Sequence, residues 1–244
     1  MNANPVRAVF FDLDGTLVET TAAFYRRYFE LLAAEFPGGR GAELVQAVMA
    51  ATEEVRREGE RAEPVGERIL QGMARRMAME VGTLSRFFDR FYATVFSSLA
   101  GTVHPIPGVA RLLDAARGLG VPLGVASDPV FPKDVILQRL RWGGLDPAWF
   151  ELTLGAEAAR ALKPARAYFL QLAEIAGVSP EACAFLGNDP DHDGAARAAG
   201  MRVFLLRGAA HAVTHRNAGE TVPEGAAAGS LDDAVRWLSA LPTP

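Results

Sequence analysis

The 244-residue sequence contains one cysteine, no apolar run of membrane-spanning length and no excess of positive charge. With Cys183 alone, the chain cannot form an internal disulfide, and the apolar residues around it favour a buried, unreactive thiol. None of the apolar runs approaches the roughly 20 residues needed to cross a bilayer. The formal net charge of −4 gives no electrostatic reason to expect binding to nucleic acid or to an anionic membrane.

The N-terminal residues lack the pattern of a secretion signal, which is a basic segment followed by an apolar segment and small residues. We therefore expect a cytoplasmic protein. Half of the residues are hydrophobic and 22% are charged, as is usual for a globular protein. The length suits one large domain, or a core domain that carries an inserted one.

The segment Val6–Thr16 is the most informative stretch. Its first part, Val6–Phe11, is an apolar run typical of a strand buried on both faces. Asp12 and Asp14 follow at a spacing that places both carboxylates on one side of an extended chain, and Gly15 lets the backbone turn after them. Open α/β sheets bind ligands at this end of their strands. The alternative is an ordinary surface turn, because Asp and Gly are common turn residues.

Residues 18–101 predict a helical region with no convincing strand between Val18 and Ser98. Apolar residues recur at helical spacing within the groups Phe24–Leu32, Leu44–Met49, Ile69–Met77 and Leu84–Phe96. Four amphipathic helices of this length predict a small bundle with its own core. Arginine pairs such as Arg56-Arg57 favour a solvated helix face, and the alternative is that one or two arginines bind an anionic substrate.

Helix and strand patterns alternate after a linker at 101–108 that is rich in proline and glycine. The expected strands are 121–126, 150–154, 182–186 and 201–206, and the expected helices are 109–119, 132–142, 165–176 and 194–199. We expect a long loop at 208–229, followed by a final helix that Ser230 caps with Asp233 in the capping-box position. This alternation predicts an α/β fold in which a parallel sheet has helices on both faces.

Polar residues follow the expected strands of this second region. They are Ser127, Asp128, Lys163, Asn188, Asp189, Asp191 and Asp193. In a parallel sheet they lie at the same edge as Asp12 and Asp14. Each has a structural alternative: Ser127 or Asp128 could cap a helix, Lys163 could be an exposed loop lysine, and Asp191 or Asp193 could complement a helix dipole.

A cluster of oxygen atoms with few nitrogens or thiolates suits a hard divalent cation, and Mg²⁺ is the natural candidate. The cation would relieve the repulsion between carboxylates and attract a phosphate group. One aspartate could then act as a nucleophile, and a second carboxyl two residues later could protonate the leaving oxygen and activate water. Lysine and serine side chains would hold the phosphoryl oxygens.

Taken in chain order, these polar segments resemble the four motifs of the haloacid dehalogenase-like hydrolase superfamily. Asp12–Thr16 is similar to its first motif, Ser127 to the second, Lys163 to the third, and Gly187–Asp189 with Asp193 to the fourth. The resemblance implies a Rossmann-like sheet with the first strand at its centre, and a type-1 helical cap. Residues 1–17 and 102–244 would form the core and residues 18–101 the cap.

The resemblance also implies roles for individual residues. Asp12 would be the nucleophile and Asp14 the general acid and base, while Ser127 and Lys163 would hold the phosphoryl group. The expected Mg²⁺ ligands are Asp12, Asp14, Asn188, Asp189 and Asp193. Asp14 favours phosphoryl transfer over carbon–halogen hydrolysis, because the dehalogenases of this superfamily lack an aspartate at its position.

Two positions depart from the family pattern. Asn188 stands where an aspartate usually follows the glycine of the fourth motif, so either its amide oxygen or the displaced Asp189 completes the metal shell. Asp128 stands where the related subgroup commonly has asparagine. A carboxylate at that place would repel a phosphate unless it is paired or points away.

The predicted function is Mg²⁺-dependent hydrolysis of a small phosphorylated metabolite through an aspartyl-phosphate. One alternative is a phosphomutase, which uses the same residues but returns the phosphoryl group to a sugar. Another is a binding or scaffold protein that descends from such an enzyme, with Asn188 and Asp128 as signs of weakened catalysis. The leaving group and the oligomeric state are left open.

Overall fold

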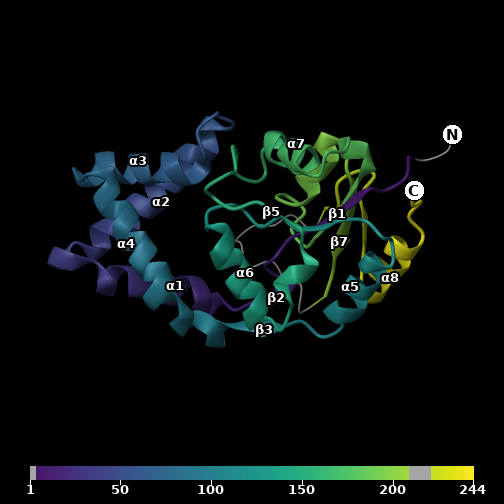
Figure 1. Ribbon diagram of the computed structural model, residues 1–244, viewed down its shortest axis with the longest axis horizontal. Helices are drawn as coiled ribbons and strands as arrows, with labels where there is room; N and C mark the ends of the chain where they lie inside the picture. The colour runs from purple at the N-terminus through teal and green to yellow at the C-terminus, as the bar shows by residue number, and fades with distance from the viewer. Residues whose placement is uncertain (1–3, 209–220) are drawn as a thin grey trace.

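A computed structural model describes residues 4–208 and 221–244 (Figure 1). The strands are β1 (Ala8–Phe11), β2 (Val18–Thr20), β3 (Val103–Pro105), β4 (Leu123–Val125), β5 (Leu152–Thr153), β6 (Cys183–Gly187), β7 (Arg202–Leu206) and β8 (Ala227–Gly229). The helices are α1 (Ala22–Glu35), α2 (Gly41–Glu58), α3 (Val65–Met77), α4 (Val81–Thr94), α5 (Val109–Arg117), α6 (Lys133–Trp142), α7 (Arg166–Ile175) and α8 (Leu231–Ser239). Among the described helices, none combines the length and the apolar character needed to cross a membrane.

The described chain forms a six-stranded parallel sheet in the order β5-β4-β1-β6-β7-β8. β1 lies between β4 and β6, and its four residues are all buried, as its unbroken apolar sequence requires. Helix α7 covers one face of the sheet, and α5 and α8 cover the other (Figure 1). The structure thus confirms the predicted α/β fold with helices on both faces.

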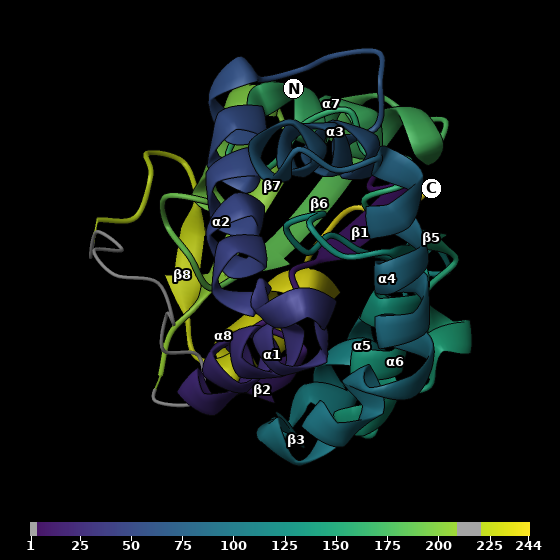
Figure 2. The same ribbon diagram turned by 90° about the vertical axis from the view of Figure 1, so that its left-hand side faces the viewer.

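Helices α1–α4 form a separate group beside the carboxyl ends of the strands (Figures 1 and 2). α2 packs against α1 and α3, and α3 packs against α4. The group begins directly after β2 and ends shortly before β3, and these two strands pair antiparallel, which holds its two ends together. The predicted absence of a strand between Val18 and Ser98 is therefore wrong. β2 has three residues, too few for a period of two to be recognised.

The linker predicted at 101–108 contains β3, and the loop predicted at 208–229 contains β8, which pairs with β7. Residues 209–220 of that loop lie outside the described part of the chain. The helix predicted at 194–199 is a 3-10 helix. The predicted capping box of the last helix is present, since Ser230 and Asp233 bind each other's backbone N–H groups.

Aromatic rings connect α1 with the segment that follows β4. Phe24 and Tyr28 of α1 contact Phe131 edge-on, with ring centroids 6.3 Å and 5.3 Å from its own. Phe96, which follows α4, also packs against Phe24 and Phe131. This buried cluster fixes α1 against the edge of the sheet where the candidate site lies.

Candidate active site

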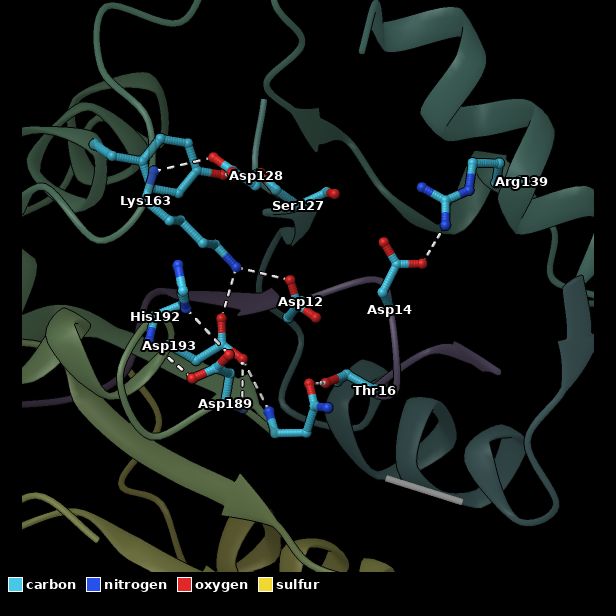
Figure 3. Close-up of polar contacts among 12 residues, drawn as sticks. Asp12, Asp14, Thr16, Ser127, Asp128, Arg139, Lys163, Asp189, His192 and Asp193 are labelled. Carbon is cyan, nitrogen blue, oxygen red and sulfur yellow. Dashed lines mark hydrogen bonds and ion pairs between the residues drawn. The ribbon is translucent and has the colours of Figure 1, made fainter. Parts of the chain in front are cut away.

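Strands β1, β4 and β6 bring the residues that follow them to one edge of the sheet (Figure 3). Asp12 follows β1, and its backbone N–H donates to the carbonyl of Leu186 in β6. Ser127 follows Ala126, whose N–H donates to the carbonyl of Phe11 in β1. Parallel pairing thus places Asp12, Ser127 and the residues after Gly187 side by side, as the sequence predicts.

Lys163 joins two buried carboxylates. Its Nζ lies 2.7 Å from Oδ1 of Asp12 and 2.7 Å from Oδ1 of Asp193, and its side chain is 2% exposed. Nζ also lies 5.0 Å from the ring centroid of Phe185. Burial disfavours the charged form of a lysine, but the two carboxylates outweigh burial and raise the pKa of Lys163 above its usual value. The prediction that Lys163 lies at the carboxylate edge agrees with this geometry, and the exposed-loop alternative does not.

Asp12 lies in an environment with more negative than positive charge. Burial and the nearby Asp193 raise the pKa of Asp12 above that of an ordinary aspartate, while Lys163 opposes the rise and Asp14 adds to it. A carboxyl group must be ionised to act as a nucleophile. A further positive charge beside Asp12 would favour that ionised form.

Asp193 organises the loop that follows β6. Its Oδ2 accepts hydrogen bonds from the backbone N–H groups of Asn188, at 2.9 Å, and Asp189, at 3.0 Å. A Cβ on Gly187 would lie 2.3 Å from this carboxylate, so the close approach requires glycine. With Lys163 on Oδ1, both oxygens of Asp193 have partners.

The described hydrogen bonds of the Asp189 carboxylate are to residues of its own loop. Its Oδ1 accepts from the N–H groups of Asp191 and His192, and its Oδ2 lies 3.1 Å from Nδ1 of His192. Burial alone would raise the pKa of Asp189, but the hydrogen bonds from His192 outweigh it and lower the pKa to about 2. His192 is not among the predicted site residues, although an aspartate and a histidine three residues apart are a recognisable signal.

Asn188 lies against the turn that follows Asp14. Its Oδ1 accepts a hydrogen bond from Oγ1 of Thr16 at 3.1 Å. A Cβ on Gly15 would lie 2.4 Å from its Nδ2, so this side chain packs closely on the glycine. Asn188 is 3% exposed. The structure therefore places the amide group next to the first motif, where the sequence analysis proposed a metal ligand.

Asp14 points away from Lys163 and toward Arg139 (Figure 3). Its Oδ1 accepts from Nη2 of Arg139 and from Oγ1 of Thr20, and its Oδ2 accepts from the Tyr25 hydroxyl at 3.2 Å. Burial and the charge of Asp14 raise the pKa of Tyr25, so its hydroxyl stays protonated as a donor. Asp14 and Asp12 thus leave the same strand but bind different partners.

Arg139 is completely buried on α6. Its guanidinium carbon lies 4.4 Å from the ring centroid of Phe24 and 5.7 Å from that of Phe131. Within residues 4–208 and 221–244, its Nε and Nη1 have no hydrogen-bond partner. A buried arginine is rare unless it is paired, so the contact with Asp14 explains its presence. The position of Arg139 could not be predicted from the sequence, because an arginine in a helical pattern usually faces solvent.

Asp128 is paired rather than free. Its Oδ2 lies 2.7 Å from Nη2 of Arg56, and its Oδ1 accepts from the backbone N–H of Lys163 at 3.1 Å. Arg56 also donates to the main-chain carbonyl of Lys163. Its neighbour Arg57 is 72% exposed, so one arginine of this pair reaches the site and the other faces solvent. Because Asp128 is paired with Arg56, its carboxylate would repel a nearby phosphate less than an unpaired one would.

The other predicted residues have clear positions. Ser127 is buried, and its carbonyl accepts from the Tyr168 hydroxyl at 2.8 Å. Asp191 is exposed. The structure therefore groups Asp12, Lys163 and Asp193 directly, with Ser127 and Asn188 beside them.

The donor set suits a cation that keeps most of its own water. In the part of the chain that the structure describes, no group of three or more His, Cys, Asp or Glu side chains could hold a metal by itself. Asp14, Asp189 and Asp193 use both carboxylate oxygens in the contacts described above. Asp12 and Asn188 each have one described side-chain contact through an oxygen, to Lys163 and to Thr16, and both lie next to the first motif. Mg²⁺ commonly binds one or two carboxylates together with water and a substrate phosphate.

Known proteins resemble this chain over most of its length. Residues 6–200 match the model of a family described as haloacid dehalogenase-like hydrolase. The phosphoglycolate phosphatase of Escherichia coli (strain K12) is 30% identical over 211 residues, which cover 80% of this chain and 79% of that protein. The phosphoglycolate phosphatase of Xylella fastidiosa (strain 9a5c) is 31% identical over 208 residues, with coverages of 82% and 79%.

The fold is also known from crystal structures. The L-2-haloacid dehalogenase PA0810 superposes with a TM-score of 0.61 at 19% identity, covering 96% of this chain and 99% of that one. At this identity the similarity concerns the fold alone.

Proposed function

Because the chain belongs to the haloacid dehalogenase-like hydrolase family, we propose that it hydrolyses a phosphate monoester, with Asp12 as the nucleophile. The observation that carries this proposal is the buried lysine bridge, in which Lys163 contacts both Asp12 and Asp193. Asp14, two residues later, supports phosphoryl transfer over dehalogenation. The names of the relatives, phosphoglycolate phosphatases at 30% and 31% identity, support the same reaction class.

We propose that the enzyme uses Mg²⁺, held by Asp12 and Asn188. Bound there, the cation would supply positive charge to the ionised Asp12 and to the phosphoryl oxygens. The raised pKa of Asp12 supports this assignment, because burial and repulsion from Asp193 leave that carboxylate short of positive charge. Asp189 and Asp193 then serve to shape the loop that carries Asn188.

In the proposed reaction, a carboxylate oxygen of Asp12 attacks phosphorus. The new P–O bond forms as the bond from phosphorus to the leaving oxygen breaks, and protonated Asp14 gives its proton to that oxygen. Lys163 orients Asp12 and, with Ser127, holds the phosphoryl group. Water then attacks phosphorus of the aspartyl-phosphate and Asp14 takes a proton from it. The P–O bond to Asp12 breaks, so phosphate leaves and the Asp12 carboxylate is restored.

Asp14 must move for this role, because its carboxylate is turned toward Arg139 (Figure 3). A rotation of its side chain would direct the carboxyl group toward Asp12. Thr20, Arg139 and Tyr25 hold the turned position, so they control when the proton donor reaches the substrate. We assign these three residues a positioning role.

We propose that residues 18–101 form a cap over a core made of residues 1–17 and 102–244. α1–α4 lie beside the strand ends that carry the site (Figure 1). Arg56 of α2 reaches Asp128 and the carbonyl of Lys163, so the cap touches two segments of the site. A closed cap would exclude bulk water from the aspartyl-phosphate.

Phosphate release from a panel of phosphate monoesters tests the proposal. The account predicts release that requires both Mg²⁺ and Asp12, so Asp12→Asn has no turnover while its circular dichroism matches that of the wild type. Turnover by Asp12→Asn at near the wild-type rate would contradict the role of Asp12. Recovery of a phosphorylated sugar isomer in place of free phosphate would instead identify a mutase.

A further inference from the structure

A cavity of about 950 Å³ lies between helices α1–α4 and the segment that follows Ser127. Side chains from all four helices line it, together with Val130 and Phe131. Apolar and aromatic groups dominate the wall, among them Tyr28, Phe29, Val48, Leu70 and Phe88. A cavity of this size can hold a drug-sized molecule, which is far larger than a phosphoryl group.

Two lining residues connect the cavity with the proposed phosphoryl site. Tyr25 lines the cavity and donates its hydroxyl to Asp14. Arg56 also lines it and binds Asp128 and the carbonyl of Lys163. Each of these side chains therefore joins the cavity wall to a residue of the site, Tyr25 to Asp14 and Arg56 to Asp128.

The charged residues of the cavity are mainly acidic. Five carboxylates and two basic side chains belong to its lining, and the carboxylates are Glu53, Glu67, Asp89, Asp134 and Glu157. All five residues are exposed, so they lie at the solvent side of the apolar wall. One of the two basic residues, Arg56, is already paired with Asp128. This rim disfavours a leaving group that carries a second negative charge.

We propose that the cavity binds the alcohol portion of the substrate, and that the substrate is a phosphate monoester with a bulky, uncharged, apolar group. This inference rests on the proposed phosphatase function, which places the phosphoryl end at Asp12. Burial of the apolar group against the aromatic wall supplies the binding free energy. Met49, an apolar residue that is 57% exposed in the lining, gains cover when the cavity is filled.

Binding of alkylphosphonates, which resist hydrolysis, tests the cavity directly. With Mg²⁺ present, calorimetry of methyl-, butyl- and octylphosphonate should give a Kd that falls about fourfold for each methylene that becomes buried. 3-Carboxypropylphosphonate, which has the length of the butyl compound and one more negative charge, should bind about tenfold more weakly than butylphosphonate. Equal Kd values along the alkyl series would overturn the inference.

A substitution in the cavity wall tests whether the alkyl chain binds in this cavity. Met49→Glu introduces a charge at an exposed position of α2, where a substitution has little effect on the stability of the fold. Its Kd for octylphosphonate should rise about tenfold while that for methylphosphonate stays the same. Ile175→Glu is the matched control, because Ile175 is also an exposed apolar residue, 39% exposed, but lies on α7 away from the cavity. An unchanged octylphosphonate Kd in Met49→Glu would assign the binding to another place.

Turnover of the corresponding alkyl phosphates separates this inference from the proposed function. The esters have leaving alcohols of similar reactivity, so kcat/KM should rise from methyl to octyl in parallel with binding. Phosphate release at the same kcat/KM for all lengths would support the phosphatase and overturn the substrate class. Chain-length-dependent binding without any phosphate release would overturn the phosphatase and retain the apolar binding site.

Discussion

Asp12 and Asp14 lie two residues apart, yet they have different partners in the structure. Asp12 is bound to a lysine that it shares with Asp193, and Asp14 is bound to a buried arginine and two hydroxyl groups. Environments that differ in this way allow two carboxyl groups to take different roles in one reaction. The different partners of the two carboxyl groups support the proposal that Asp12 is the nucleophile and Asp14 the proton donor.

Replacement of Arg139 tests the positioning of Asp14. We expect Arg139→Met to lower kcat about tenfold or more with little change in KM, because the Asp14 carboxyl group, without an ordered partner from which it rotates, takes several orientations and reaches the leaving oxygen less often. Arg139→Lys should recover part of the loss, since a lysine keeps the charge. Arg141→Met, at an exposed position of the same helix, serves as the control. Steady-state kinetics of Arg139→Met equal to those of the wild type would remove Arg139 from the account.

The sequence predicts which residues meet at the sheet edge better than it predicts the contacts that support them. Asp12, Ser127, Lys163 and Asp193 follow or precede elements that are easy to recognise, so parallel pairing brings them together. Arg139 lies 125 positions from Asp14 in the sequence, and its helical pattern is that of an ordinary surface arginine. Burial of such a residue depends on tertiary packing against Phe24 and Phe131, which no local pattern contains.

At the scale of elements, the end of β6 sets the geometry of the site. Gly187 ends that strand, and the loop after it folds back so that Asp193 binds the N–H groups of Asn188 and Asp189. The other oxygen of the Asp193 carboxylate contacts Nζ of Lys163. One strand end therefore positions both the loop and the lysine.

Gly187→Ala tests this arrangement. Its Cβ would lie 2.3 Å from the Asp193 carboxylate, so Asp193 must shift and Lys163 loses part of its support. We expect kcat/KM to fall about tenfold or more, because small displacements of catalytic groups are costly. The control is Gly101→Ala, where an added Cβ meets no atom within 4 Å among the described residues. Equal losses in both variants would show that the effect does not arise at Asp193.

Helices α1–α8 and strands β1 and β4–β7 could be predicted from the sequence, whereas β2, β3 and β8 could not. Helices α1–α8 follow apolar repeats of several turns, and β1, β6 and β7 follow apolar runs. β2, β3 and β8 each have three residues and form because neighbouring chain pairs with them. Their stability comes from tertiary position, which is the reason why local patterns do not reveal them.

At the scale of the whole molecule, the helical group contacts the site through the Arg56–Asp128 ion pair, through hydrogen bonds from Arg56 and Tyr25, and through an aromatic cluster. Arg56 and Asp128 have side chains 26% and 29% exposed and belong to segments 72 positions apart. An ion pair that is partly exposed contributes little to folding. We therefore expect the Arg56–Asp128 pair to affect the placement of α2 over the site more than the free energy of unfolding.

A double-mutant cycle separates these effects. We expect Arg56→Met and Asp128→Asn to show a coupling of about 0.5–1 kcal/mol in the free energy of unfolding by urea. KM for the substrate should rise in both single variants, because α2 is no longer held at Asp128. Arg57→Met is the control on the same helix, since Arg57 is 72% exposed. A rise in KM for the control equal to that for Arg56→Met would argue against a specific contact.

Acid quenching, after the enzyme is mixed with a radiolabelled phosphate monoester that it turns over, shows whether the phosphoryl group is transferred to Asp12. We expect label bound covalently to the wild-type protein, on the peptide that contains Asp12, at times shorter than one turnover. Asp12→Asn should carry none. Phosphate release by the wild type without any labelled protein, at times that resolve a single turnover, would contradict transfer of the phosphoryl group to Asp12.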